Sequence, residues 1–190
     1  WPVRSGETIL FQAAAGGMGL IACQWAKSIG ARVIGTAGNP DKVALAKANG
    51  CDEVINYSQE DFAVRVRELT NGKGVDVVYD GVGQDTFEKS LDCLRPMGLM
   101  VSYGNATGPV SVPDLGILAR KGSLFVTRPT GAHYFAERPA LLAGAKALFA
   151  AVESGAVKPH IGQRFALSEA ADAHRALEGR KTVGSTILLP

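Results

Sequence analysis

The fold of this chain is decided near its start, in the stretch Ile9-Leu10-Phe11-Gln12-Ala13-Ala14-Ala15-Gly16-Gly17-Met18-Gly19-Leu20-Ile21-Ala22. The pattern predicts an apolar β-strand, a tight glycine-rich turn and then a helix. Gly17, Gly19 and Ala22 have the G-x-G-x-x-G/A spacing of a dinucleotide-binding loop. In such a loop one glycine permits the turn, the next lets the backbone approach a pyrophosphate, and a small third residue lets the helix pack on the strand. The alternative is a turn that packs helix on sheet and binds nothing.

Strand and helix signals alternate from this stretch to about residue 160. Further strands are predicted at 31–36, 53–55, 75–79, 98–103 and 123–127, and helices at 18–29, 40–49, 61–69, 86–94, 115–121 and 139–154. Strands that alternate with helices of this length form right-handed βαβ units. The sequence therefore predicts an α/β fold, a Rossmann-like doubly wound parallel sheet of about six strands, with ligands at the carboxyl ends of the strands.

The last thirty residues have a different pattern. A strand at 163–167, a helix at 168–178 and a strand at 185–189 follow the sixth strand of the sheet. Ser168 is expected to cap that helix and Glu169 to favour its dipole. We expect residues 1–160 to form a dinucleotide-binding domain and residues 161–190 to form a separate C-terminal segment.

Composition excludes several classes of partner. The chain has 190 residues, is 46% hydrophobic and carries 20 basic and 18 acidic side chains, for a net charge of +2. This balance speaks against a nucleic-acid partner or a membrane surface, and charged or glycine residues interrupt every apolar run. The three cysteines are widely spaced, without a C-x-x-C motif, which favours buried thiols in a reducing, cytoplasmic compartment. Since the three histidines lack H-x-x-x-H spacing, no metal site is predicted.

The residues after the second strand indicate which nucleotide is bound. NAD-binding proteins usually place a carboxylate at this strand tip to hold the ribose 2′-OH. Here the strand runs into Gly35-Thr36-Ala37-Gly38-Asn39, and the first carboxylate, Asp41, lies later, at a helix start. Gly38 leaves space and Lys42 supplies a cation for a 2′-phosphate, so NADPH is expected rather than NADH. The alternative is that Lys42 is an ordinary solvated helix lysine.

A resemblance that covers essentially the whole chain extends this hypothesis. It rests on the glycine turn and on the following motifs: Cys23-Gln24-Trp25-Ala26-Lys27, Val54-Ile55-Asn56-Tyr57, Val78-Tyr79-Asp80-Gly81-Val82-Gly83, Gly98-Leu99-Met100-Val101-Ser102-Tyr103-Gly104-Asn105 and Lys121-Gly122-Ser123-Leu124-Phe125-Val126-Thr127-Arg128-Pro129. The chain resembles the zinc-independent quinone oxidoreductases of the medium-chain dehydrogenase/reductase superfamily. This resemblance implies NADPH as electron donor and quinones as acceptors. It also implies a GroES-like catalytic domain before this segment, which residues 161–190 would complete.

The resemblance also implies a set of cofactor contacts. The pyrophosphate would lie at Gly17, Met18, Gly19 and Leu20. The 2′-phosphate would lie among Gly38, Lys42 and Tyr57, and the adenine or ribose near Val82. The remaining expected contacts face the nicotinamide half or reach back from the tail: Tyr103, Gly104, Asn105, Pro129, Thr130, Gly131, Ala132 and Arg180. For Tyr57 an equally good interpretation is a packed aromatic side chain at a strand end.

Two further points stay open. The acceptor could instead be an alkenal or enoyl thioester, or the chain could bind NADPH without turnover, and no catalytic residue is identified. The predicted strand 123–127 is the free edge of an open sheet, and free edges invite pairing with another chain. Together with the resemblance, this edge predicts a homodimer through Ser123–Thr127.

Overall fold

The computed structural model describes residues 2–179 and 181–190. Its main sheet contains six parallel strands in the order β3-β2-β1-β4-β5-β6. The strands are β1 (Thr8–Phe11), β2 (Arg32–Ala37), β3 (Glu53–Asn56), β4 (Val75–Asp80), β5 (Leu94–Ser102) and β6 (Phe125–Thr127). This is the strand order of a doubly wound dinucleotide-binding fold, so the predicted fold class is confirmed.

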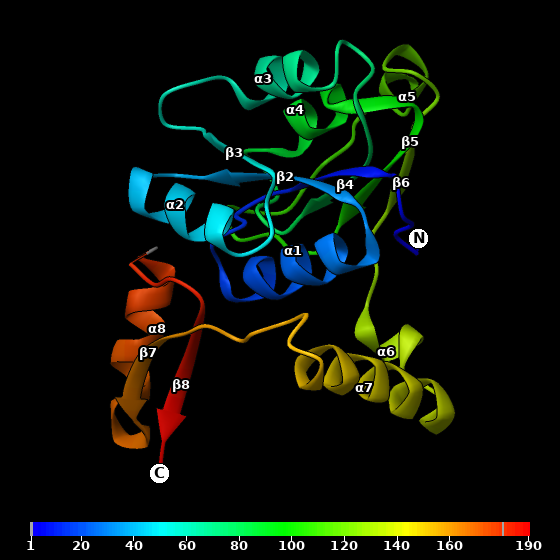
Figure 1. Ribbon diagram of the computed structural model, residues 1–190. Coiled ribbons are helices and arrows are strands. Elements are labelled where there is room, and N and C mark those ends of the chain that lie inside the picture. Colours follow the sequence, from blue (N-terminus) through cyan, green and yellow to red (C-terminus); the bar gives the residue numbers. More distant parts are fainter. Residues whose placement is uncertain (1, 180) are drawn as a thin grey trace.

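The helices cover the sheet in two layers (Figure 1). One face carries α1 (Gly17–Ile29) and α2 (Pro40–Ala48), and the other carries α3 (Phe62–Leu69) and α4 (Phe87–Asp92), with α5 (Gly116–Arg120) near the edge. Successive side chains of a strand point to opposite faces. Ile9 and Phe11 accordingly belong to the core under α1, whereas Leu10 belongs to the core under α3 and α4.

The glycine turn is built differently from the prediction. The left-handed residue of this turn is Ala13, with φ 55°, and not the first glycine of the motif. Gly16 is the extended N-cap of α1. A Cβ added at Gly19 would lie 2.6 Å from the carbonyl oxygen of Ala14 and 2.7 Å from that of Ala13. Gly19 therefore lets the first turn of α1 press directly onto the backbone of the strand end.

Several predicted boundaries shift. β5 begins at Leu94, inside the helix predicted over 86–94, because Leu94 pairs with Val75 before an irregularity in the register. β6 is shorter than the predicted 123–127, since Ser123 is left-handed, with φ 56°. A short helix, α6 (Gly131–Tyr134), was not predicted.

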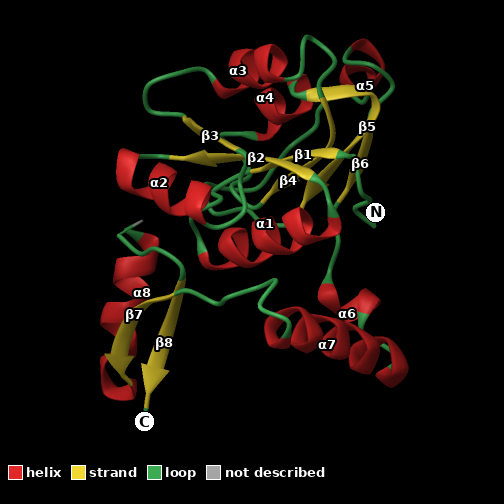
Figure 2. Ribbon diagram, in the orientation of Figure 1, coloured by secondary structure: helices red, strands yellow, loops and turns green. Residues whose placement is uncertain are grey.

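The C-terminal segment forms a second, two-stranded parallel sheet of β7 (Ile161–Ala166) and β8 (Ser185–Leu189), visible as a separate pair of arrows in Figure 2. Between them lie a 3-10 turn, η1 (Leu167–Glu169), and α8 (Ala170–Glu178). The expected Ser168 cap is wrong. Instead the carboxylate of Glu169 accepts a hydrogen bond from the backbone N–H of Ala166, 3.0 Å away.

The second sheet touches the main body at the glycine turn. The backbone N–H of Gly184 donates to the carbonyl of Ala15 at 3.0 Å, and Gly16 and Gly184 form an isolated β-bridge. The entry to α1 is thus held between strand β1 and the start of β8. The long helix α7 (Arg138–Glu153) and α6 stand off from the sheet on the α1 side (Figure 1).

Candidate cofactor-binding site

A cavity of about 410 Å³ opens at the carboxyl ends of the central strands. Its lining comes from the turn after β1, the ends of β2 and β3, the loop after β4, the loop after β5 and Thr182 of the tail. The strand order reverses between β1 and β4, and ligands of open α/β sheets bind in the crevice at this point. Its volume lies within the roughly 300–1,000 Å³ range of small-molecule sites.

The predicted adenosine contacts meet in this cavity. Gly38, Lys42, Tyr57 and Val82 all line it, although Lys42 belongs to α2 and the other three follow β2, β3 and β4. Gly38 is required by the tyrosine, because a Cβ on Gly38 would lie 2.5 Å from the Tyr57 hydroxyl oxygen. The Tyr57 side chain is half-exposed rather than packed into the core. Its hydroxyl is therefore available to a ligand, which favours the ligand-contact interpretation over the packed aromatic one.

The start of α2 brings positive potential to the same place. Asn39 caps the helix by accepting a hydrogen bond from the backbone N–H of Lys42 at 2.9 Å. Pro40 occupies the first turn, where its missing N–H costs nothing. A helix N-terminus and a lysine side chain both favour a bound anion.

Three carboxylates at the cavity were not predicted, namely Glu60, Asp61 and Asp85. Asp61 forms an ion pair with Lys89 at 2.6 Å and accepts from the backbone N–H of Ala63, capping α3. The hydrogen bond from Lys89, followed by those from the backbone, lowers the pKa of Asp61. Asp61 is the first residue of the helix predicted over 61–69, but nothing local indicated that the chain after β3 would bring it to this cavity.

A buried polar chain supports the floor of the cavity. The Thr36 hydroxyl donates to the side-chain oxygen of Gln12 at 2.6 Å, and the Gln12 amide donates to the Ser90 hydroxyl at 3.0 Å. The Ser90 hydroxyl in turn donates to Asp80 at 3.0 Å. All four side chains are buried. Gln12 and Thr36 line the cavity, so this chain of hydrogen bonds links its floor to the strand end of β4.

Asp80 also shapes the loop after β4. Its other carboxylate oxygen accepts hydrogen bonds from the backbone N–H groups of Val82 at 2.8 Å and Gly83 at 3.1 Å. The Thr86 hydroxyl donates at 2.7 Å to the same Asp80 oxygen as Ser90. The predicted contact Val82 is thus held in place by Asp80, the last residue of β4. Sequence reasoning quoted Asp80 within a motif but gave it no role, because the partner Ser90 lies ten residues later on α4.

The predicted pyrophosphate residues lie beside the cavity rather than in its lining. Gly19 and Leu20 are buried under the strand, and Gly17 faces the tail, with its Cβ position 3.1 Å from the Gly184 carbonyl oxygen. Met18 is exposed and lines a second, apolar groove. The structure places Ala15 and Gly16, directly before these four residues, at the cavity itself.

The residues expected to contact the nicotinamide half do not lie in one place. Tyr103 and Pro129 line the apolar groove with Met18. Burial raises the pKa of Tyr103, whose ring lies 5.9 Å from that of Phe11 between centroids. The backbone of Gly104 sits so close to Gly81 that a Cβ would meet its carbonyl oxygen at 2.4 Å. The remaining residues are Asn105, one position before the lining residue Ala106, and the exposed Thr130, Gly131 and Ala132. Arg180 lies outside the described residues.

The thiols are buried in the core. Cys23, Cys51 and Cys93 are free and buried. A hydrogen bond with Cys51, followed by burial, raises the pKa of Cys23, and burial raises the pKa of Cys93. Thiols held protonated in this way are poor nucleophiles and poor metal ligands. Within residues 2–179 and 181–190, no three His, Cys, Asp or Glu side chains are grouped so that they could hold a metal ion. Nor does that part of the chain contain a helix long and apolar enough to span a membrane.

Comparison with known proteins gives consistent matches. The family model of the zinc-binding dehydrogenases matches residues 17–143. A quinone oxidoreductase of Pseudomonas aeruginosa is 56% identical over 190 residues, which are 100% of this chain and 58% of that protein. A 2-haloacrylate reductase of a Burkholderia species is 50% identical over 192 residues, covering 99% of this chain and 57% of that protein.

Among solved structures, the crystal structure of Escherichia coli quinone oxidoreductase complexed with NADPH is similar. It superposes with a TM-score of 0.97 at 49% identity, over 100% of this chain and 59% of that one. The chain thus spans a little under three fifths of the length of these relatives.

Proposed function

The chain belongs to the zinc-binding dehydrogenase family, and on that premise we propose that it is the NADPH-binding part of an oxidoreductase that passes reducing equivalents from NADPH to quinones. One observation carries the proposal. The cavity at the strand-order reversal brings Gly38, Lys42 and Tyr57 together at the start of α2. Support also comes from relatives that are quinone oxidoreductases and from the NADPH complex of one of them.

The residues fit the 2′-phosphate end of NADPH. The cavity has a lysine and a tyrosine hydroxyl in its lining, beside a glycine whose missing side chain leaves the hydroxyl in place. An NAD site would instead have a carboxylate at the tip of β2. The carboxylates that are present come from β3 and β4 loops, and Asp61 is neutralised by Lys89. We therefore assign the 2′-phosphate to Lys42 and Tyr57, and the adenine or ribose to Val82.

When bound, NADPH supplies the hydride, and the protein supplies orientation and electrostatics. The backbone of the first helical turn, at Gly17, Met18, Gly19 and Leu20, is assigned to the pyrophosphate, next to the cavity at Gly16. The residues that follow β5 and β6 are assigned to the nicotinamide half. They are Tyr103, Gly104, Asn105, Pro129, Thr130, Gly131 and Ala132, with Arg180 reaching from the tail.

Further parts of the proposal concern the whole protein. Residues 161–190, which form their own two-stranded sheet, are assigned to the catalytic domain rather than to the dinucleotide-binding domain of residues 1–160. The reaction is proposed to be independent of zinc and to take place in the cytoplasm, where buried thiols such as Cys23 stay reduced. The protein is proposed to act as a homodimer through the edge strand β6.

A second candidate acceptor has a specific observation in its favour. The 2-haloacrylate reductase matches nearly as well as the quinone oxidoreductases. Its name indicates reduction of an activated carbon–carbon double bond, the class to which alkenals and enoyl thioesters also belong. Turnover of a quinone and of a 2-haloacrylate by the full-length protein separates the two, and turnover of neither favours a non-catalytic NADPH-binding role.

The cofactor assignment is tested by calorimetry with NADPH and NADH on the full-length protein. Lys42→Glu is expected to weaken NADPH binding by about 10- to 100-fold, because a hydrogen bond to a charged group contributes about 1.5–3 kcal/mol. NADH binding should change several-fold at most. Lys47→Glu is the matched control, since Lys47 is an exposed lysine at the other end of the same helix. Equal losses for both nucleotides in Lys42→Glu would contradict the assignment.

A further inference from the structure

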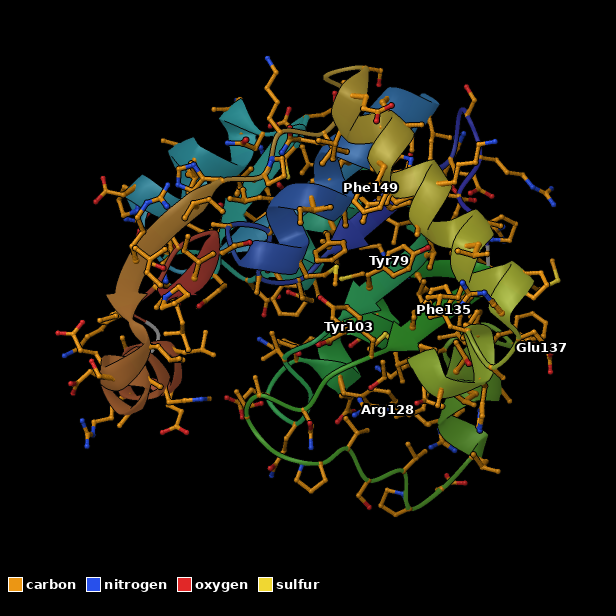
Figure 3. The ribbon with its side chains drawn as sticks, turned by 90° about the horizontal axis from the view of Figure 1, so that it is seen from below. Tyr79, Tyr103, Arg128, Phe135, Glu137 and Phe149 are labelled. Carbon is orange, nitrogen blue, oxygen red and sulfur yellow. The ribbon has the colours of Figure 1, made fainter. Side chains whose placement is uncertain are left out.

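Tyr57, in the lining of the cavity, is held differently from the other tyrosines of the main sheet. Tyr79 and Tyr103, labelled in Figure 3, lie over the strands, and their rings are 5.8 and 5.9 Å from that of Phe11 between centroids. The Tyr57 side chain is 46% exposed. A half-exposed side chain is positioned by its own backbone and by close neighbours rather than by a surrounding core. The position of the Tyr57 hydroxyl therefore depends on the turn that carries it.

This turn, which follows β3, is closed by Asn56, the last residue of the strand. The Asn56 side chain is buried, and its oxygen accepts a hydrogen bond from the backbone N–H of Ser58 at 3.1 Å. The Asn56 carbonyl accepts from the backbone N–H groups of Gln59 at 3.0 Å and Glu60 at 3.1 Å. Asparagine side chains commonly bond to the backbone two residues further on and so build a turn. Asn56 therefore fixes the direction in which the chain leaves the sheet.

The turn is also tied to the tip of β2. The backbone N–H of Tyr57 donates to the carbonyl of Ala37 at 3.1 Å, directly after the last paired residues of the β2–β3 ladder. One residue further on, the Ser58 hydroxyl donates to the carbonyl of Gly38 at 2.7 Å. The four-residue strand β3 lies at the edge of the sheet and pairs with β2 on one side. The bond from Ser58 thus extends a short ladder by one side-chain contact.

Gly38, which accepts this bond, lies directly against the Tyr57 ring. A Cβ on Gly38 would lie 2.5 Å from the Tyr57 hydroxyl oxygen and 2.9 Å from the ring carbon that bears it. A shift of the turn relative to Gly38 would therefore move the hydroxyl out of this contact. Because the Ser58 hydroxyl joins the turn to the Gly38 backbone, it sets the separation between Gly38 and the Tyr57 hydroxyl.

We propose that Ser58 is a positioning residue for the choice of cofactor. Its hydrogen bond to the Gly38 carbonyl holds the Tyr57 hydroxyl where that hydroxyl donates to the 2′-phosphate of NADPH. NADH has no phosphate at this position, so the Ser58 bond contributes to the affinity for NADPH and not to that for NADH. This inference rests on the NADPH assignment made above, and it extends that assignment to a residue outside the lining of the cavity.

Binding and turnover of the full-length protein with NADPH and NADH test the proposal. Ser58→Ala is expected to raise the Kd for NADPH, measured by calorimetry, about 3- to 10-fold, as the loss of one neutral hydrogen bond does. The Kd for NADH should change by less than about twofold. The KM for NADPH should rise by the same factor as its Kd, whereas kcat at saturating NADPH stays unchanged. Ser58→Thr keeps a hydroxyl and should retain the parent's preference for NADPH.

Ser28→Ala is the matched control. The Ser28 hydroxyl makes the same kind of bond, to the carbonyl of Trp25 at 2.7 Å, but at the end of α1 opposite to the cavity. This substitution should leave the affinities for both nucleotides unchanged.

A double-mutant cycle shows whether Ser58 acts through Tyr57. Tyr57→Phe removes the hydroxyl assigned to the phosphate and should itself raise the Kd for NADPH about 3- to 30-fold. In a protein that already carries Tyr57→Phe, adding Ser58→Ala should cause no further loss of NADPH affinity, because residues that act as one unit give non-additive effects. The same loss with and without the Tyr57 hydroxyl overturns the positioning role.

The outcomes separate this inference from the function on which it rests. A parent protein that binds NADPH and NADH equally well contradicts the NADPH assignment, and the role of Ser58 is overturned with it. If the parent prefers NADPH but Ser58→Ala weakens both nucleotides alike, the bond only stabilises the edge of the sheet and the proposal is overturned alone. A parent that prefers NADPH and an unchanged Ser58→Ala variant overturn it as well, and leave the assignment of Lys42 in place.

Discussion

The body formed by β1 to β6 and the later region of the chain are packed to very different degrees. The later region begins with an arm, residues 128–155 with α6 and α7, and ends at the C-terminus. In the body, strand residues such as Leu10, Ile34 and Val78 are fully buried, and buried polar groups have partners. In the arm and tail, Leu142, Phe149 and Leu177 are more than half exposed. The difference shows that the body carries its own core, whereas the later region leaves large apolar side chains exposed.

The largest expected effect compares the same substitution in the two regions. Leu10→Ala removes a side chain with no exposed area between β1 and the helices α3 and α4. It should lower the free energy of unfolding by about 2–5 kcal/mol, because the cavity left behind adds to the lost burial. Leu142→Ala in the arm should change it by less than about 0.5 kcal/mol at concentrations where the protein is monomeric. Urea unfolding measures both, and equal effects would mean that the arm is packed on its own chain.

A smaller effect tests whether the polar chain under the cavity holds the body together. Ser90→Ala removes the acceptor for the Gln12 amide and one donor to Asp80, all of them buried. Leaving such groups unpaired should cost about 1–3 kcal/mol of stability. The loop at Val82 should also loosen, so the KM for NADPH should rise with little change in kcat. Ser154→Ala in the arm is the matched control, because the Ser154 hydroxyl bonds only to the Ala151 carbonyl within its own helix end.

The same division separates what the sequence predicts well from what it does not. Regular alternation of strand and helix patterns predicted the body. The residues after the second strand pointed to Gly38 and Lys42, the family resemblance added Tyr57, and all three line one cavity.

The glycine motif predicted that its first glycine permits the tight turn. In the structure Ala13 adopts the left-handed conformation of this turn, which glycine usually adopts. The spacing identified Gly19 as a motif residue. Its close packing against the carbonyl groups of Ala13 and Ala14 depends on the folded turn and could not be read from the spacing.

Contacts between distant segments could not be predicted. Asp61 stands at the start of a helix and Asp80 at the end of a strand, and their roles at the cavity depend on which strands become neighbours. The apolar pattern of α7 predicted a helix and said nothing of which surface it meets. The periodicity of apolar residues indicates which face of a helix is buried. Only the topology of the fold determines which surface that face packs against. In the arm that partner is absent from the chain's own packing.

The smallest expected effect concerns the ion pair between Asp61 and Lys89 at the rim of the cavity. The pKa of Asp61 is lowered in the folded protein, chiefly by the hydrogen bond from Lys89, so the folded state favours the charged carboxylate. The resulting stabilisation is fully present above the unfolded pKa of about 3.9 and is lost as the pH falls through the lower folded value.

Asp61→Asn should therefore be less stable than the parent above about pH 5, and the gap should close as the pH falls below about 4. The gap itself should be about 0.2–1 kcal/mol, because both partners are half-exposed and screened. In a protein that already carries Lys89→Gln, adding Asp61→Asn should cause a smaller loss of stability, because the ion pair is already absent. Unfolding by urea at a series of pH values measures it. The Arg175–Asp172 pair of the tail is confined to one helix and exposed, so Asp172→Asn should leave stability at pH 7 unchanged. A pH-independent gap for Asp61→Asn would instead assign the effect to lost capping of α3, where Asp61 accepts from Ala63.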